Sequence, residues 1–149
     1  MNVAGIRILV VDDHPFQRSA IAGVLRTFGV VNVLGAPDAP SALSLLRQVP
    51  PVDVVICDLD LPGMDGVALI QQIAEQRSAR SLILCSGASP AVQEMVATIA
   101  VDSGLPVLGY VGKPMMAPDL WGMLALLEDL APRDAGEFPA RTQAVSRPR

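Results

Sequence analysis

The 149-residue sequence has little of several features that mark large classes of proteins. Aromatic residues make up 3%, and the two cysteines are too few for a disulfide scaffold. Lysine and arginine number 11 against 15 aspartates and glutamates, a net charge of −4. We therefore expect no direct binding to nucleic acid, which needs a basic surface. No apolar run approaches the roughly 18 residues of a membrane span, so we expect no membrane insertion.

The same scarcity bears on the cellular compartment. Cys57 and Cys85 each end an apolar run, and we interpret both as small buried side chains in a reducing compartment. The N-terminus has neither the basic segment nor the apolar stretch of a secretion signal. The sequence thus predicts a cytoplasmic protein.

The chain is rich in short apolar segments, and 51% of its residues are hydrophobic. A single domain of this length can bury a sizeable core without metal or disulfides. Unbroken apolar runs with many β-branched residues are typical of strands buried on both faces of a parallel sheet. Such runs are Ile6–Val11, Val30–Leu34, Val52–Cys57, Leu82–Cys85 and Val107–Val111.

Segments with helical spacing of apolar residues separate these runs. They are Phe16–Phe28, Ser41–Val49, Val67–Gln76, Pro90–Val101 and Leu120–Leu130. Strict alternation of strands and helices predicts an α/β fold with a doubly wound parallel sheet. Such sheets bind their ligands beyond the carboxyl ends of the strands.

The periodic pattern stops near the C-terminus. From Pro132 onward the sequence is rich in proline and arginine and has no apolar period. We expect the folded domain to span residues 5–131, and residues 132–149 to form a disordered tail or linker.

Polar residues follow four of the predicted strands, where each strand ends. Asp12 and Asp13 follow the first, Asp58 the third and Ser86 the fourth, and Lys113 follows the fifth. Two carboxylates ~4 Å apart repel by about 4 kcal/mol at an effective dielectric of about 20, so the cluster should raise a pKa or recruit a cation. Oxygen ligands with open positions suit Mg²⁺. With a lysine and a hydroxyl added, the set could stabilise a transferring phosphoryl group.

The residues around these positions resemble those of a known family. The segments are Leu9–Asp13, Asp58–Gly66, Leu84–Ala88 and Gly109–Pro114. In this order they resemble the receiver domains of two-component response regulators, over about residues 5–131. The resemblance implies a flavodoxin-like (βα)5 fold with strand order 2-1-3-4-5.

The resemblance also implies a role for each site residue. Asp58 would accept a phosphoryl group from a histidine kinase or phosphotransfer protein. Asp12, Asp13 and Asp58 would hold Mg²⁺ together with the backbone carbonyl of Asp60. Lys113 would pair with a phosphoryl oxygen, and Ser86 would close on the phosphoryl group. Tyr110 would change rotamer with it, and the Lys113–Pro114 peptide bond would be cis.

By this resemblance the chain is a phosphorelay switch and not a turnover enzyme on external substrates. Its output would be protein association, as a homodimer or with a downstream effector. The implied surface comprises the helix at 90–101, the strand at 107–111 and the helix at 120–130. The exposed faces of Trp121 and Leu126 are candidates for it.

One spacing departs from the family pattern. Ser86 and Lys113 are 27 residues apart, which is several residues longer than usual. The extra residues fall near 102–106, at the end of the fourth helix. Residues 86–88 and 104–109, on either side of the fourth helix, are similar to receivers fused to cyclic-di-GMP phosphodiesterase domains.

Other interpretations compete with this one. Cys57–Asp60, Ser86 and Lys113 imitate the motif order of haloacid-dehalogenase-like phosphatases, although the acidic pair of that class should follow the lysine. A pseudo-receiver acting only as an interaction module is a second alternative. Single motifs also have plainer interpretations. Asp12–Asp13 could be a helix N-cap, and His14 a solvated residue at a helix start. Gly63 and Gly66 could be turn glycines.

Overall fold

The computed structural model describes residues 2–61 and 65–130, and contains one five-stranded parallel sheet. The strands lie in the order β2-β1-β3-β4-β5, which confirms the predicted fold class and strand order. Their bounds are β1 Arg7–Val11, β2 Asn32–Ala36, β3 Val54–Cys57, β4 Leu82–Cys85 and β5 Val107–Val111. The tail expected at 132–149, and Gly63, lie outside the described residues.

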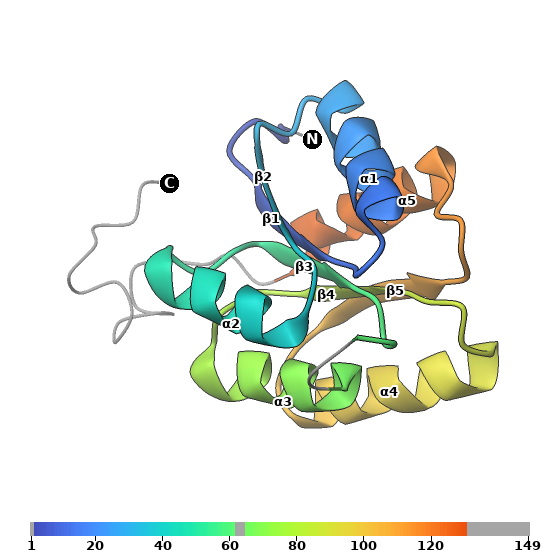
Figure 1. Ribbon diagram of the computed structural model, residues 1–149. Helices are drawn as coiled ribbons and strands as arrows, with labels where there is room; N and C mark the ends of the chain where they lie inside the picture. Colours follow the sequence, from blue (N-terminus) through green and yellow to red (C-terminus); the bar gives the residue numbers. More distant parts are fainter. Residues whose placement is uncertain (1, 62–64, 131–149) are drawn as a thin grey trace.

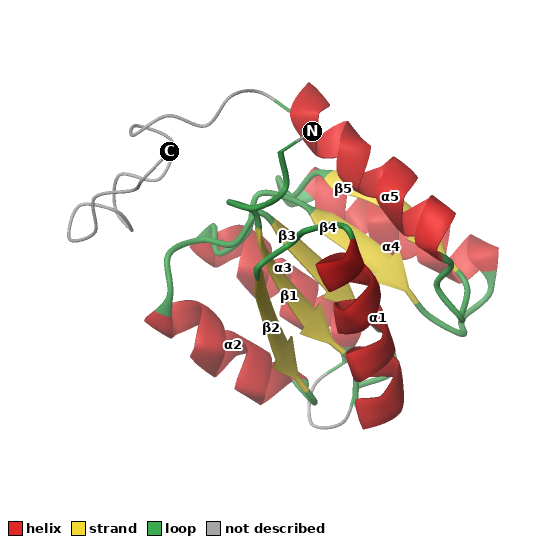
Figure 2. Ribbon diagram, turned by 90° about the horizontal axis from the view of Figure 1, so that it is seen from above, coloured by secondary structure: helices red, strands yellow, loops and turns green. Residues whose placement is uncertain are grey.

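Helices cover both faces of the sheet (Figure 1). Helices α1, Pro15–Thr27, and α5, Ala117–Ala125, lie on one face. On the other lie α2 Ala39–Gln48, α3 Gly66–Gln76 and α4 Pro90–Asp102. Figure 2 shows the sheet from above, with its strands fanned between the helical layers. Within the described residues, no helix has the length and apolar character that crossing a membrane requires.

The central strands are buried because their side chains meet helices on both sides. All four residues of β3 and all four of β4 are buried. Leu82 and Leu84 pack toward α2, α3 and α4, while Ile83 packs toward α1 and α5. Each such side chain contributes about 1.5–3 kcal/mol on leaving water. Unbroken apolar runs in the sequence therefore identified these strands correctly.

Eight of the ten predicted helices and strands have different bounds in the structure, and two of these differences have a clear physical cause. The second strand begins at Asn32 rather than Val30, because Gly29, at φ 101°, turns the chain and places Val30 in the core. The last helix begins at Ala117 rather than Leu120, with Pro118 in its first turn. It ends at Ala125 and continues as a 3₁₀ turn, Leu126–Asp129, that keeps Leu127 buried.

Residues 102–106, where the sequence interpretation places the extra length, form an ordered helix end. Helix α4 continues to Asp102, and Gly104, at φ 95°, reverses the chain. The Leu105 amide then donates to the carbonyl of Ala100 at 2.9 Å, and the Leu105 side chain is buried. This capping pattern ends the helix and directs the chain into β5.

Gly66 has a different role from the turn glycine expected from the sequence. It is the first residue of α3, and its φ is not positive. A Cβ atom there would lie 2.8 Å from the Cα atom of Leu59, so only glycine lets α3 approach the loop that follows β3. This loop carries Asp58 and Asp60, so the close approach bears directly on the site.

Candidate functional site

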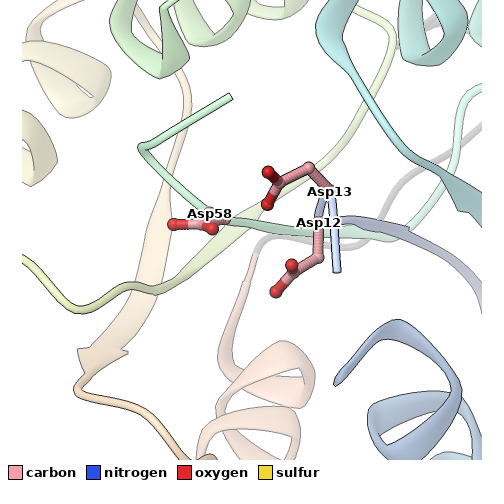
Figure 3. A group of neighbouring side chains, drawn as sticks. All are labelled: Asp12, Asp13 and Asp58. Atoms are coloured by element: carbon pink, nitrogen blue, oxygen red, sulfur yellow. The ribbon is translucent and has the colours of Figure 1, made fainter. Parts of the chain in front are cut away.

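Parallel pairing brings the acidic residues of two strands together. Val11 pairs with Cys57, so Asp12 and Asp58, the residues that follow them, leave the sheet side by side. The Asp58 amide donates to the carbonyl of Val11 at 3.0 Å. Carboxylate oxygens of Asp12, Asp13 and Asp58 lie within 4.8 Å of one another, around one small space (Figure 3).

This spacing is suited to a single divalent cation. Oxygen ligands on opposite sides of one Mg²⁺ ion are about 4.2 Å apart, twice a bond length of about 2.1 Å. The three carboxylates therefore need only a small movement to contact the same ion. Asp12 and Asp58 are buried, whereas Asp13 is exposed and leaves the site open to solvent. The donor set consists of hard oxygen ligands, which suit Mg²⁺ better than soft metals.

Lys113 supplies the positive charge of the site. Its Nζ donates to Asp58 Oδ2 at 2.7 Å and lies 3.1 Å from Asp12 Oδ2. Partial burial acts to lower the pKa of Lys113, but hydrogen bonds and charge from Asp58 and Asp12 outweigh it and raise this pKa. The ammonium is therefore charged at neutral pH, and it offsets one of the three negative charges.

Asp12 is held by its neighbours in an orientation that faces the site. Its Oδ1 accepts a hydrogen bond from the His14 amide at 2.9 Å, and its carbonyl accepts one from Arg18 Nη1 at 2.6 Å. The N-cap of α1 is His14, whose side chain makes no capping bond. The helix-cap interpretation of Asp12–Asp13 is therefore wrong, while His14 is the exposed helix-start residue expected.

The remaining predicted site residues lie at or near the carboxyl ends of β3, β4 and β5. The Asp60 amide donates to Asp58 Oδ1 at 3.2 Å. Ser86 is buried at the end of β4, and its Oγ accepts from the Ala88 amide at 3.1 Å. Tyr110 pairs with Leu84 across β4 and β5 and is partly exposed. The peptide bond between Lys113 and Pro114 is cis.

Two polar residues near the site were missed by the sequence interpretation. One is Arg18, whose bond to the Asp12 carbonyl depends on the packing of α1 and has no sequence signal. The other is Gln93 of α4, which is buried, whereas the neighbouring apolar residues Val92 and Met95 of the same helix are exposed. Gln93 precedes buried Val96 by three residues and Ala100 by seven. A polar residue on the apolar stripe of a helix was the available signal.

Both cysteines lie close to the site, but their thiols stay protonated at neutral pH. Burial raises the pKa of the Cys85 thiol to about 11. Burial, with the charges of Asp58 and Asp12, raises the pKa of Cys57 even further. Neither thiol ionises near neutral pH, so the candidate ligands are the carboxylates.

We expect Asp13→Asn to stabilise the metal-free protein. Its carboxylate is exposed and repels Asp12 and Asp58 across less than 4.8 Å. Removing that charge should raise the free energy of unfolding by about 1 kcal/mol after solvent screening. Urea unfolding without metal measures the gain. Added Mg²⁺ should stabilise the wild type but much less the variant, because bound ligand stabilises only a protein that binds it.

The exposed α4 residue Glu94 provides a matched control. Glu94→Gln removes one negative charge outside the acidic cluster, so it should leave both the stability and the Mg²⁺ effect nearly unchanged. Equal Mg²⁺ stabilisation of wild type and Asp13→Asn would contradict the metal site.

The fold and site together define a class of protein. The family described as Response regulator receiver domain matches residues 8–125, and the chain belongs to this family. By family, the receiver domain itself is not a turnover enzyme. The phosphatase alternative is set aside because the acidic pair follows β1, ahead of Asp58.

Individual relatives agree with this assignment. The chain is 31% identical to the cyclic di-GMP phosphodiesterase RocR of Pseudomonas aeruginosa over 94% of this chain, but spans only 37% of that protein. It is 31% identical to chemotaxis protein CheY-3 of Vibrio cholerae, covering 77% of this chain and 85% of the relative. The structure of a response regulator from Colwellia psychrerythraea superposes with a TM-score of 0.69 at 28% identity, over 84% of this chain and 98% of the other.

Proposed function

We propose that this protein is a phosphorelay switch that accepts a phosphoryl group on Asp58 in a reaction that requires Mg²⁺. One observation carries the proposal. Three carboxylates that could contact a single cation lie together, and the ammonium of Lys113 is 2.7 Å from the proposed acceptor. A structural role alone would not favour a cluster with two uncompensated negative charges.

The proposed step transfers a phosphoryl group between two side chains. An oxygen of the Asp58 carboxylate attacks phosphorus, and the bond from phosphorus to a donor histidine nitrogen breaks. The electron pair of that bond stays on the imidazole, and an acyl phosphate forms on Asp58. Lys113 is positioned to neutralise charge on the transferred group. The Asp12, Asp13 and Asp58 carboxylates and the Asp60 carbonyl would hold Mg²⁺, which shields the phosphoryl oxygens from carboxylate repulsion.

A direct test is incubation with acetyl phosphate, with Mg²⁺ or with a chelator. We expect one phosphoryl group per chain by mass spectrometry in the presence of Mg²⁺ and none with the chelator. Hydroxylamine should remove the group, because it cleaves acyl phosphates. Absence of uptake under both conditions would favour the pseudo-receiver alternative instead.

We expect the phosphoryl donor to be a histidine kinase or phosphotransfer protein. We expect this protein to lie in the cytoplasm. Phe16, one residue into α1, is 85% exposed beside the acidic pair, and Met116, after β5, is 56% exposed. Two large apolar side chains at the rim would suit a docking protein that brings phosphohistidine to Asp58. The similarity to RocR supports a receiver that regulates a cyclic-di-GMP phosphodiesterase domain.

The proposed output surface comprises α4, β5 and α5 at the β5 edge of the sheet. On α4, Met95 is 60% exposed, and on β5 Tyr110 is exposed as well. Trp121 of α5 also has a structural role within the domain, because its ring packs edge-on against Phe28 with ring centroids 4.9 Å apart. The exposed α4 residues are therefore better probes of this surface than Trp121.

We expect Met95→Glu to block association induced by beryllofluoride without blocking phosphorylation. A carboxylate introduced at the centre of an apolar contact costs desolvation energy there but nothing in the monomer. Sedimentation with and without beryllofluoride measures the shift in dimerisation. Trp121→Glu, in contrast, should lower stability through loss of the Phe28 contact. If the wild type keeps the same mass and the same affinity for its effector in both states, this surface is not the output.

A further inference from the structure

Helix α1 places one arginine against the backbone of the acidic pair. Arg18 is half-buried, and its Nη1 donates to the carbonyl oxygen of Asp12 at 2.6 Å. Hydrogen bonds from a charged donor are shorter and stronger than those between neutral groups. This carbonyl belongs to the planar peptide group that joins Asp12 to Asp13. Arg18 therefore holds the orientation of the peptide between the two acidic residues.

Asp13 depends on this peptide group more than Asp12 does. Asp12 has two further bonds, from its amide to the Ala36 carbonyl at 3.1 Å and to its Oδ1 from the His14 amide at 2.9 Å. The Asp13 side chain is exposed, and within the described residues its carboxylate has no hydrogen bond or ion pair. It nevertheless faces the same small space as Asp58 (Figure 3). Its direction is therefore set by the peptide group that precedes it.

Strand β2 leaves room for the arginine that holds this peptide. The Arg18 side chain passes over Gly35, where a Cβ atom would lie 3.2 Å from Cδ and 3.5 Å from Nε of the arginine. Alanine at this position would push the arginine away by a few tenths of an ångström. The φ of Gly35 is not positive, so the backbone itself does not require glycine. The absent side chain is instead what lets Arg18 lie against the strand.

We propose that Arg18 is a positioning residue for the metal site, which holds the Asp12–Asp13 peptide so that the Asp13 carboxylate faces Asp58. The guanidinium has no acceptor atom and is not itself a ligand, so it acts through the backbone. A ligand that is already oriented loses less freedom when the ion binds. The inference rests on the metal site of the proposed function, and it adds a residue outside the ligand set that determines the affinity of that site.

The positive charge of Arg18 predicts the opposite effect on metal binding. A cation beside the site repels Mg²⁺, so removal of the charge alone would strengthen Mg²⁺ binding. Because the side chain is partly exposed, solvent and salt screen this repulsion. Loss of the bond to the Asp12 carbonyl would weaken Mg²⁺ binding instead. The sign of the affinity change on removing Arg18 therefore distinguishes positioning from charge.

Arg18→Met tests the inference, because methionine keeps an apolar stem and removes the guanidinium. We expect Mg²⁺ to bind about tenfold more weakly, as for other partners outside a ligand set. A Mg²⁺ titration followed by ¹H–¹⁵N NMR measures this affinity on the folded protein, so a loss of stability alone does not change it. Arg26→Met is the matched control, because Arg26 is exposed and lines the same groove between α1 and β2. It should keep an affinity close to that of wild type.

A conservative variant separates the hydrogen bond from the bulk of the side chain. Arg18→Lys keeps the charge and one donor but loses the planar fork, so it should recover part of the affinity that Arg18→Met loses. Recovery would contradict the charge explanation, under which lysine and arginine weaken Mg²⁺ binding equally and methionine binds more tightly.

Gly35→Ala supplies a second arm that keeps the arginine itself. The added methyl group displaces the Arg18 side chain and weakens its bond, so Mg²⁺ affinity should fall about threefold. Gly23→Ala, where a Cβ atom meets nothing within 4 Å, is the control and should keep wild-type affinity. In metal-free protein, the ¹H–¹⁵N resonance of Asp13 should move in Arg18→Met and Gly35→Ala but not in the controls, because its amide belongs to the peptide that Arg18 holds.

The outcomes separate the inference from the proposed function. If wild-type protein binds no Mg²⁺, the metal-dependent function is wrong and the inference falls with it. If wild type binds Mg²⁺ and Arg18→Met binds it equally or more tightly, only the inference is overturned. An equal loss of affinity in Arg26→Met would overturn it too, as would an Asp13 resonance that stays in place in metal-free Arg18→Met.

Discussion

Asp58→Asn is expected to abolish phosphoryl uptake from acetyl phosphate in the presence of Mg²⁺. An amide is a far weaker nucleophile than a carboxylate and cannot form the acyl phosphate. The position is specific, because Asp58 Oδ2 accepts from Lys113 at 2.7 Å and its other oxygen accepts from the Asp60 amide at 3.2 Å. Mass spectrometry of the intact protein should show complete loss of the added group.

Asp60→Asn is the matched control, because it is two residues further along the same loop and exposed. Its contribution to the site is through the backbone, which the substitution keeps. The variant should therefore accept a phosphoryl group at a rate close to that of wild type. Normal labelling of Asp58→Asn, or its loss only in Asp60→Asn, would show that the acceptor has been assigned to the wrong residue.

Lys113→Ala should have the second-largest effect, on switching rather than on the fold. The ammonium contacts both Asp58 and Asp12, at 2.7 and 3.1 Å. Without it the phosphoryl group loses the contact that connects Asp58 to the end of β5, so phosphorylation should no longer shift Tyr110. The NMR signals of Tyr110 with and without beryllofluoride measure this. A full Tyr110 shift in the variant would rule out this role.

The same substitution should lower stability because it leaves two buried carboxylates without their cation. Removing one partner of a fully buried pair costs about 3–5 kcal/mol, and partial exposure of Lys113 reduces the expected loss to about 2 kcal/mol. Arg80→Ala removes a cation from Asp53, which it contacts at 3.5 Å. It should also lower stability while leaving beryllofluoride binding and the Tyr110 shift unchanged.

The stability loss should depend on pH in a defined direction. The pKa of Lys113 is raised in the folded state, so its contribution is fully present below the unfolded pKa of about 10.4. It is lost as the pH rises through the higher folded pKa. Urea unfolding should show a constant difference between wild type and Lys113→Ala from pH 7 to about 10, and a shrinking difference above it.

Much of the architecture follows from local patterns that any reader of the sequence can find. Apolar runs such as Leu82–Cys85 are too continuous for a sheet exposed on one face, and their alternation with helical segments leaves few topologies. The rule that ligands bind at carboxyl ends then points to Asp12, Asp13, Asp58 and Lys113. Four motifs in order sufficed to indicate the family.

Local patterns were weaker at the edges of elements. Val30 and Asn32 are both compatible with a strand, and only the turn at Gly29 decides where β2 begins. Gly66 could have been a turn residue by type, and its contact with Leu59 exists only because α3 packs against that loop. Contacts between segments distant in sequence decide such cases, so propensity alone does not.

The fold class and the residues of the candidate site could be predicted from the chain alone, because both predictions depend on the order of apolar and polar residues along it. How residues far apart in sequence meet could be seen only in the folded molecule. The tertiary structure placed the ammonium of Lys113 2.7 Å from Asp58, 55 residues away. It also buried Gln93 rather than Met95. The physical reason is that periodicity indicates which side of a helix is apolar, whereas the neighbouring strands and loops determine which atoms that side contacts.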